Sequence, residues 1–403
     1  MHHFIFPTQD TWISSGSSTI TGESFRDQNF GKDQILEVKK EFFNDSFNHQ
    51  TRALINFDGV GFNELKSEID RNNITNPRFY LRLYEAEGNA EISSTYDLTA
   101  NPLYQAWVEG NGKFENNPKT TDGCSWENSA NPFGGSAITW SFDNTVTFDD
   151  FHSLFITAQS EFGGVSGSDY LGGDSDANGG VWIEDLGFQA SQSFNLQSPD
   201  VEMDVSSIVN KWLDSEIANY GFIVKFSGSQ ETDTATFGHL KFFSRNTHTI
   251  YSPRLEIRWD DSIFDNNATA SLNELTMSGL ADNFLYMRGL RDEYREGERV
   301  KFRIGARKRY IQKTFTNSVQ TVSSSYIPEG KGFYAIKDIA TDEFVVPFSE
   351  YTSMSLDEGG MYFNQWLDGF YPDRAYKIQL KLNYDDGQEQ IFDDDFEFVV
   401  KRK

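Results

Sequence analysis

The sequence predicts an all-β protein built from two consecutive β-sandwiches. Short runs such as Phe79–Tyr84 and Leu255–Trp259 alternate apolar and polar residues with a period of two, between Gly, Asn, Asp and Ser. This alternation is typical of half-buried strands. Aromatic side chains, which sheets favour, make up 15% of the 403 residues. With only 10 prolines, the chain is expected to be ordered throughout most of its length.

Residues 1–259 are predicted to form the first sandwich. Its expected strands include Ile35–Val38, Arg52–Asp58, Phe79–Tyr84, Phe222–Phe226 and Leu255–Trp259. Helical signals are few and occur at Phe62–Arg71 and Val205–Trp212. In the second of these, Asp204 can cap the helix, and the apolar residues recur at a spacing of 3.6 along one face.

The second sandwich is predicted over residues 273–403. A polar stretch without apolar periodicity, residues 260–272, is interpreted as the linker before it. The number and spacing of the later strands are those of an immunoglobulin-like sandwich, without its Cys-Trp-Cys hallmark. The strands are expected at 274–279, 298–305, 332–338, 343–348, 360–367, 374–383 and 391–400.

Short segments of the first two thirds of the chain follow one another in an order that resembles a known family. They are Asp10–Gly16, Asn29–Gly31, Ile35–Val38, Arg52–Asp58, Phe79–Tyr84, Ala106–Gly110, Gly112–Gly123, Ser125–Trp126, Ala190–Phe194, Asp204–Trp212, Asn219–Val224 and Ser252–Ile257. The series resembles the DNRLRE-type β-sandwich domain, a relative of carbohydrate-binding jelly rolls, in the variant found in structural proteins of contractile-tailed marine phages. Polar loops at 60–77 and 160–190 interrupt the pattern.

The resemblance implies a fold and a function. The fold is a jelly-roll-like sandwich at the N-terminus. The function is that of a non-enzymatic virion structural protein, on the tail, baseplate, neck or capsid exterior. Its partners are then other virion subunits, on which strand edges and loop faces dock in a symmetric assembly.

Charge and cysteine content restrict the partners and the compartment. The chain carries 61 acidic and 35 basic residues, a net charge of −26, which repels nucleic acid and anionic membranes. The single cysteine, Cys124, excludes an intramolecular disulfide and favours folding in a reducing cytoplasm. Neither a signal peptide nor a run of about 18 apolar residues occurs. These features agree with a virion protein that is assembled in the host cytoplasm and released by lysis.

One segment has the pattern of a calcium loop. In Asp174–Asp185, the residues Asp174, Asp176, Asn178 and Gly179 occupy the first, third, fifth and sixth positions of a twelve-residue loop, and Asp185 the last. Oxygen ligands at these positions converge on a hard cation, and glycine permits the sharp turn. No helical pattern flanks the segment, and the same residues are common in exposed loops. A calcium site and a plain loop are both retained as hypotheses.

Signals for enzymatic chemistry are weak. The six histidines form no metal-binding spacing, and neither a Gly-x-Ser-x-Gly turn nor a phosphate-binding glycine loop occurs. Cys124 is interpreted as a buried thiol. Glycosidases use two carboxylates, but the adjacent acids at 149–150, 385–386 and 393–395 fall at apparent turns. The chain is therefore predicted not to be an enzyme and to use no cofactor other than calcium.

Glycan binding on the virion is the alternative function. Exposed aromatic rings stack on sugar faces, and Trp107 and Trp182 are the candidates near predicted loops. The competing interpretation is that these rings are structural, because large aromatic side chains are mostly buried. Exposed aromatics around one concave face would favour glycan binding, whereas flat apolar patches on both sandwiches would favour assembly.

Overall fold

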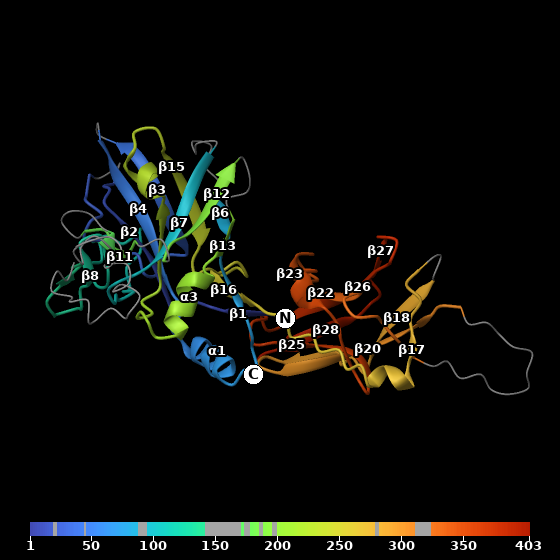
Figure 1. The fold of residues 1–403 in the computed structure, drawn as a ribbon. Helices are drawn as coiled ribbons and strands as arrows, with labels where there is room; N and C mark the ends of the chain where they lie inside the picture. Colours follow the sequence, from blue (N-terminus) through green and yellow to red (C-terminus); the bar gives the residue numbers. More distant parts are fainter. Residues whose placement is uncertain are drawn as a thin grey trace, which may run out of the picture. The chain divides into compact units, whose positions relative to one another are not determined.

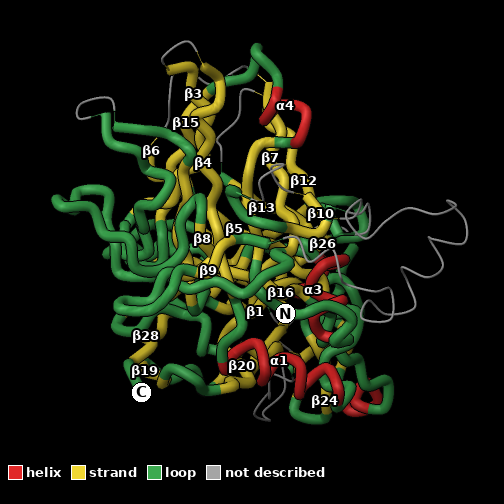
Figure 2. Tube along the Cα trace, turned by 90° about the vertical axis from the view of Figure 1, so that its left-hand side faces the viewer, coloured by secondary structure: helices red, strands yellow, loops and turns green. Residues whose placement is uncertain are grey.

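The computed structural model describes the whole chain except residues 19–21, 44–45, 88–94, 142–170, 173–177, 185–187, 196–199, 279–281 and 311–323. Strands dominate it (Figures 1 and 2), and most strand pairs are antiparallel. The prediction of a mostly β protein is therefore confirmed. The described residues divide into two compact units. The N-terminal unit comprises Ile5–Arg71 and Arg78–Glu256, and the C-terminal unit comprises Met1–Phe4, Asn72–Pro77 and Ile257–Lys403.

The N-terminal unit contains one large sheet and several smaller ones. The large sheet has the order β12 (Ala190–Asn195), β7 (Thr95–Pro102), β14 (Phe222–Phe226), β4 (Ser46–Asn56), β3 (Ile35–Phe43), β15 (Gly238–Phe243) and β6 (Glu85–Glu87), and β2 (Gln9–Ser14) pairs with β4. A second sheet contains β16 (Arg254–Arg258), β5 (Arg78–Leu83) and β13 (Val201–Asp204). Two short pairs are β8 (Asn128–Ala130) with β9 (Ile138–Thr139), and β10 (Leu171–Gly172) with β11 (Trp182–Ile183).

Alternation explains why these segments are strands. In β5, Phe79, Leu81 and Leu83 are completely buried, whereas the residues between them are partly exposed. In the described part of this unit, the sheets are accompanied by the helices α1 (Val60–Asp70), α3 (Ser206–Leu213) and α4 (Gly228–Thr232). The first two confirm the predicted helices to within two residues. Asp204, the predicted cap of α3, lies one residue before the N-cap, which is Val205 and makes no side-chain cap hydrogen bond. The Asp204 carboxylate still accepts a hydrogen bond from the Ser206 N–H at 2.9 Å.

The C-terminal unit contains two six-stranded sheets. One has the order β17 (Asn273–Glu274), β21 (Ser325–Tyr326), β20 (Arg299–Lys308), β25 (Gly360–Trp366) and β24 (Ser355–Asp357), with β18 (Asn283–Arg288) beside β20. The other has the order β19 (Glu293–Arg295), β28 (Glu397–Lys401), β26 (Arg374–Asn383), β22 (Gly332–Asp338) and β23 (Phe344–Val346), with β27 (Glu389–Phe392) beside β26. Short 3₁₀ helices lie at Ala268–Ser271 and Glu350–Thr352, and β1 spans His2–Ile5.

The core of the C-terminal unit is apolar and rich in aromatic rings. Tyr334 stacks on Phe363 with ring centroids 3.8 Å apart, and Phe363 in turn lies 5.1 Å from Phe302. All three are at most 2% exposed. Such contacts combine a large buried area with favourable ring geometry.

The predicted strands of the C-terminal unit differ from the observed ones in three ways. Of the described residues 274–278, only Glu274 lies in a strand, β17. The predicted strand 391–400 is divided into β27 and β28, because Asp393–Asp395 form a solvated bend between them. The strands β18, β19, β21 and β24 were not predicted. In β19 only the central residue, Tyr294, is buried, so three residues offer too short a pattern to identify.

Candidate functional site

The predicted calcium loop falls mostly outside the described residues. Asp174, Asp176 and Asp185 lie in the segments that the structure does not describe, and Asn178 is partly exposed. Among the residues that are described, no group of three or more His, Cys, Asp or Glu side chains could hold a metal ion. The calcium hypothesis therefore stays a prediction.

The tryptophans proposed for glycan binding are buried. Trp107 is 6% exposed, with its indole N–H donating to the Tyr220 carbonyl at 2.8 Å, and Trp182 is 4% exposed. Both belong to an apolar cluster in which loops cover Ile13, Leu54 and Ile223 of the large sheet. Neither ring offers an open face to a sugar, so their burial gives the glycan hypothesis no support at these two positions.

The acids and the thiol singled out in the sequence have structural surroundings. Cys124 is completely buried, and burial raises the pKa of its thiol, which confirms the interpretation as a core residue. Asp385 and Asp393 lie at turns, where they pair with Lys331 at 2.9 Å and Lys377 at 2.7 Å. Residues 149–150 are outside the described chain.

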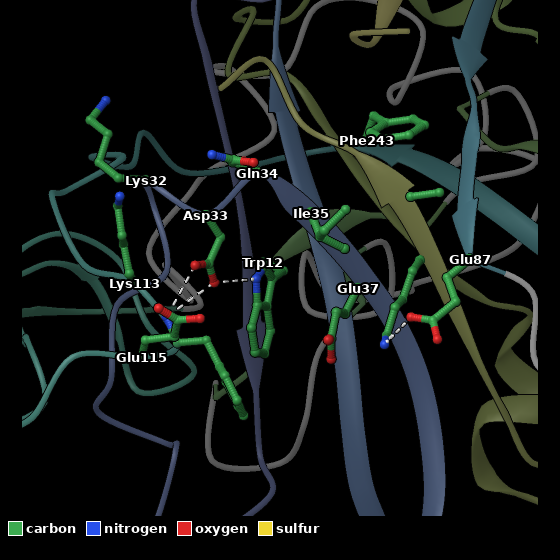
Figure 3. Close-up of a pocket in the computed structure, with 13 residues that line it drawn as sticks. Trp12, Lys32, Asp33, Gln34, Ile35, Glu37, Glu87, Lys113, Glu115 and Phe243 are labelled. Carbon is green, nitrogen blue, oxygen red and sulfur yellow. Dashed lines mark hydrogen bonds and ion pairs between the residues drawn. The ribbon is translucent and has the colours of Figure 1, made fainter. Parts of the chain in front are cut away.

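A pocket of about 450 Å³ opens on the N-terminal unit (Figure 3). Its floor comes from β3, β15 and β6, and its walls from the segment 32–34 and the loop 113–115. It is lined by Trp12, Lys32, Asp33, Gln34, Ile35, Glu37, Ala86, Glu87, Lys113, Phe114, Glu115, Lys241 and Phe243. Its size falls within the range of about 300–1,000 Å³ usual for small-molecule sites. We refer to it as the Asp33 pocket.

Phe114 is held in the wall of the Asp33 pocket by other rings. Trp12 stacks on Phe30 with centroids 3.6 Å apart, and Phe114 lies 6.2 Å from Trp12 and 5.6 Å from Phe25. Phe114 itself is 54% exposed. The cluster therefore presents one fixed aromatic surface to solvent. Because Phe114 is already ordered in the free protein, its side chain loses little conformational entropy when a ligand binds.

Asp33 is the most perturbed acid of the pocket. Its carboxylate accepts hydrogen bonds from the Trp12 indole N–H at 3.1 Å, which Figure 3 shows, and from the Phe114 backbone N–H at 3.1 Å. Burial raises the pKa of Asp33 to about 6 despite these two donors. Burial alone would also raise the pKa of Glu37, but the nearby His239 and Lys39 outweigh it and lower that pKa.

Most charges around the pocket are already paired. Glu87 pairs with Lys241, Lys32 with Glu109, and Glu37 with His239, whose Nε2 lies 3.0 Å from the carboxylate. Within the described chain, the side chains of Gln34, Lys113 and Glu115 make no hydrogen bond or ion pair. These three groups are free to bind a ligand.

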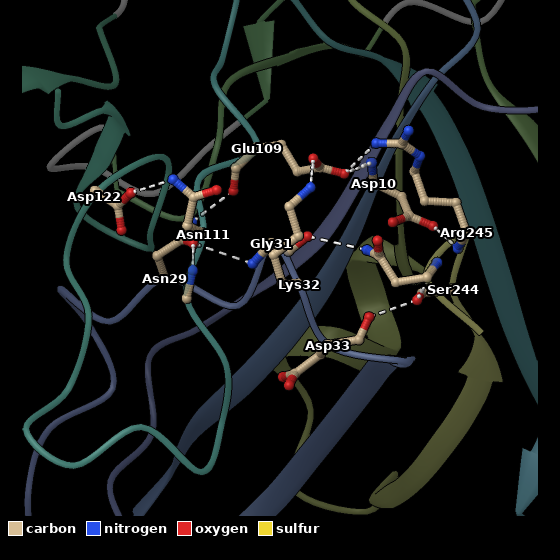
Figure 4. Close-up of polar contacts among 12 residues, drawn as sticks. Asp10, Asn29, Gly31, Lys32, Asp33, Glu109, Asn111, Asp122, Ser244 and Arg245 are labelled. Carbon is tan, nitrogen blue, oxygen red and sulfur yellow. Dashed lines mark hydrogen bonds and ion pairs between the residues drawn. The ribbon is translucent and has the colours of Figure 1, made fainter. Parts of the chain in front are cut away.

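A buried amide fixes the walls of the Asp33 pocket. Asn29 is completely buried, and its amide NH₂ donates to the carbonyls of Glu109 at 2.7 Å and Cys124 at 2.8 Å. Its side-chain oxygen accepts from the N–H groups of Gly31 at 3.1 Å and Gly112 at 2.8 Å. Figure 4 shows Asn29 between Glu109 and Gly31. One side chain thus joins the turn that leads to Asp33 with the loop that leads to Phe114.

Glycine is required where these segments meet. A Cβ atom added to Gly31 would lie 2.0 Å from the Glu109 carbonyl oxygen, and one added to Gly112 would lie 2.1 Å from the Asn29 carbonyl oxygen. Both separations are far below contact distance, so only glycine allows the two backbones to approach.

Charged groups complete this junction (Figure 4). The Glu109 carboxylate pairs with Lys32 and with Arg245, whose guanidinium lies at 2.8 Å. Beside it, Asp10 is 1% exposed and accepts the backbone N–H of Arg245. Burial raises the pKa of Asp10 to about 7. We call Asp10, Asn29, Lys32, Glu109 and Arg245 the polar junction.

The C-terminal unit presents a different surface. On the outer side of the sheet that contains β22 and β26, directly paired residues bring rings and amines together. The ammonium groups of Lys337 and Lys381 lie 4.7 Å and 5.3 Å from the ring centroids of Phe344 and Phe348. We call this surface the aromatic–lysine face; it consists of Phe333, Lys337, Phe344, Phe348, Lys381 and Ile391.

The aromatic–lysine face is apolar and electrically balanced. Phe344 is 46% and Ile391 53% exposed. The two lysines are neutralised by acids of the same unit, Lys337 by Asp342 at 2.9 Å and Lys381 by Glu389 at 3.0 Å. Exposed apolar side chains gathered on one sheet face are typical of a surface that contacts another molecule.

Comparisons with known proteins leave the family open. No family model and no curated protein sequence matches the chain. The native E. coli alpha-2-macroglobulin is similar over 99% of this chain and 26% of its own, at 8% identity and a TM-score of 0.20. A Salmonella alpha-2-macroglobulin mutant is similar over the same shares, at 9% identity and a TM-score of 0.18. The chain thus spans about a quarter of those proteins, and such low scores carry no argument about its function.

One further property concerns membranes. Within the described part of the chain, no helix is both long enough and apolar enough to cross a bilayer.

Proposed function

We propose that the protein is a non-enzymatic structural component of the virion of a contractile-tailed phage. It would lie on the exterior of the tail, baseplate, neck or capsid and be assembled in the host cytoplasm. The order of sequence segments that resembles the DNRLRE-type domain supports this proposal. In the same proposal, residues 1–259 form a jelly-roll-like sandwich, 260–272 a linker, and 273–403 an immunoglobulin-like sandwich.

The observation that carries the proposal is the aromatic–lysine face. Its rings lie on the solvent side of a sheet whose other side is filled by Tyr334, Ile336 and Leu380, all completely buried. The same strands therefore have two apolar surfaces, one packed in the core and one, the aromatic–lysine face, exposed to solvent. A neighbouring subunit that covered it would remove the rings from water at about 25 cal/mol per Å² of apolar area.

Charge favours a partner other than a free-standing copy of this chain. The protein carries a net charge of −26, so identical chains repel one another unless a scaffold holds them. The lysines of the face are paired, as described above, and add no net charge. In a virion built of several different proteins, a subunit of another kind can cover the aromatic–lysine face, and identical copies of this chain need not touch one another.

Particles of the phage that encodes the protein provide the test. We expect a reconstruction from electron cryo-microscopy to show this chain on the exterior, with a neighbouring subunit over Phe344 and Ile391. Phe344→Asp should lower the amount of protein incorporated into particles, because a carboxylate would be buried at the contact. Tyr310→Asp is the matched control, since Tyr310 is 77% exposed and belongs to the same unit but not to the face. Particles without the chain would overturn the proposal.

Glycan binding on the virion is the second candidate function. The Asp33 pocket favours it, because exposed Phe114 and the free polar groups Gln34, Lys113 and Glu115 meet in one concavity. This site is distinct from Trp107 and Trp182, at which the sequence predicted sugar binding.

A further inference from the structure

We infer that the Asp33 pocket binds an uncharged saccharide, with Phe114 as the stacking platform. The inference rests on the second candidate function and goes beyond it by naming the stacking ring and by restricting the ligand to uncharged saccharides. It depends on three properties of the pocket, namely its surface pattern, its charge and its rigidity.

The surface pattern of the pocket suits a sugar. A pyranose ring has apolar C–H faces and a rim of hydroxyl groups that donate and accept hydrogen bonds. The Asp33 pocket offers apolar surface from Phe114, Phe243 and Ile35. Between these lie a free amide, a free ammonium and a free carboxylate, from Gln34, Lys113 and Glu115. Together these groups donate to and accept from hydroxyls.

The charge of the pocket disfavours anionic ligands. Four carboxylates line it, those of Asp33, Glu37, Glu87 and Glu115, against the three ammonium groups of Lys32, Lys113 and Lys241. Two of these lysines already pair with acids, so no excess positive charge is left for uronic acids, sulfated sugars or phosphates. The side chains of Lys113 and Glu115 carry opposite charges, so together they do not require a charged ligand. A neutral hydroxyl group can accept a hydrogen bond from the ammonium or donate one to the carboxylate.

The rigidity of the pocket favours specific binding. Phe114 is buttressed by Trp12, Phe25 and Phe30, and its own backbone N–H is fixed on Asp33. Asn29 holds the loop of Gly112 and the turn of Gly31 in one position. A ligand would therefore meet a wall that folding has already ordered, so little conformational entropy is lost on binding.

Glycan arrays that carry neutral, uronic-acid-containing, sulfated and amino-sugar oligosaccharides test this inference on the full-length protein. We expect binding to neutral oligosaccharides, with affinities then measured by calorimetric titration of the best neutral probe. Phe114→Ala should weaken that affinity by about tenfold or more, since one lost ring contact of about 1.4 kcal/mol is tenfold. Glu115→Gln should also weaken it, because the charged acceptor becomes a neutral amide.

The control is Phe133→Ala, which removes a fully exposed ring outside the pocket and should leave the affinity unchanged. Both phenylalanine variants alter surface rings, and equal melting temperatures would confirm that they fold. Binding only to charged oligosaccharides, binding that survives Phe114→Ala, or no binding to any saccharide would each overturn the inference. These outcomes are independent of incorporation into particles, which tests the structural proposal separately.

Discussion

The interiors of the two units are stabilised in different ways. The N-terminal unit buries charges, since Arg52, Lys225 and Glu231 are at most 6% exposed and form one cluster. Glu231 accepts from Arg52 at 2.7 Å and from Lys225 at 3.0 Å. The C-terminal core cluster is made of apolar residues and tyrosines, exemplified by the stack of Tyr334 on Phe363. Each unit also contains the other kind of contact, since the N-terminal unit has an apolar cluster and the C-terminal unit buries Asp338 beside the partly exposed Arg374. The difference is the cluster of opposite charges that are all buried.

This difference has a structural consequence. The Arg52 guanidinium lies 4.6 Å from the ring of Trp126 and 4.9 Å from that of Trp182, and it donates to the Gly179 carbonyl at 2.6 Å. Together with the polar junction, it attaches long irregular segments to the large sheet. Directional hydrogen bonds can specify the position of a loop, which non-directional apolar contacts do less well.

The largest effect is expected when a buried charge loses its partner. Glu231→Gln keeps the shape of the side chain but removes the carboxylate that Arg52 and Lys225 share, so the free energy of unfolding should fall by about 3–5 kcal/mol. Chemical denaturation measures this, with the exposed Glu64→Gln as the matched control. Equal stability of the two variants would show that the cluster is not a stabilising unit.

Acid should reduce the effect of Glu231→Gln. Burial alone would raise the pKa of Glu231, but Arg52 and Lys225 outweigh it and lower the pKa from its ordinary value of 4.5. A carboxylate with a lowered pKa stabilises the fold above its unfolded pKa and loses that contribution as the pH falls. The stability gap between wild type and variant should therefore narrow below about pH 4.5. A gap that widens in acid would contradict the assignment.

A smaller effect is expected at Asn29. Asn29→Ala leaves four buried backbone groups without their partner, and each such group costs about 1–3 kcal/mol unless water replaces the amide. Asn29 is completely buried, so we expect a total loss of at least about 2 kcal/mol. Thermal and chemical denaturation would measure it, and an unchanged stability would mean that the amide is not structural.

The apolar interior should tolerate a conservative change. Ile378→Val removes one methylene from a completely buried position of the C-terminal core, at a cost of about 0.5–1.5 kcal/mol. This cost should not vary with pH, because no titratable group is involved. If the difference in unfolding free energy between Ile378→Val and the wild type varied strongly with pH, titratable groups would contribute to the C-terminal core, and this contrast between the two units would be wrong.

A pH dependence of the stability is expected at Asp10. Burial raises its pKa to about 7 from an ordinary value of 3.8, so the folded protein holds a proton that the unfolded chain releases. Between these values the unfolding free energy of the wild type should decrease with rising pH, relative to that of Asp10→Asn. Denaturation at several pH values would detect this, and a constant difference between the two proteins would contradict the raised pKa.

The sequence predicted the strands better than the site. Alternation is local, so β22 and β26 were predicted at their observed bounds. The segments Asn29–Gly31 and Ala106–Gly110 were singled out only as parts of a series. Their contact could not be predicted, because Asn29 and Glu109 are 80 residues apart and a hydrogen bond leaves no periodic pattern. Burial of Trp107 and Trp182 was one of two interpretations of the sequence, but their contacts with Ile13 and Leu54 could not be predicted.

The central claim is that the buried amide of Asn29 fixes the walls of the Asp33 pocket, and hydrogen exchange tests it most directly. The N–H groups of Gly31 and Gly112 lie outside every strand and donate to Asn29. In the wild type we expect both to exchange as slowly as strand amides, and in Asn29→Ala as fast as exposed loop amides. Fast exchange of both groups in the wild type would contradict the claim.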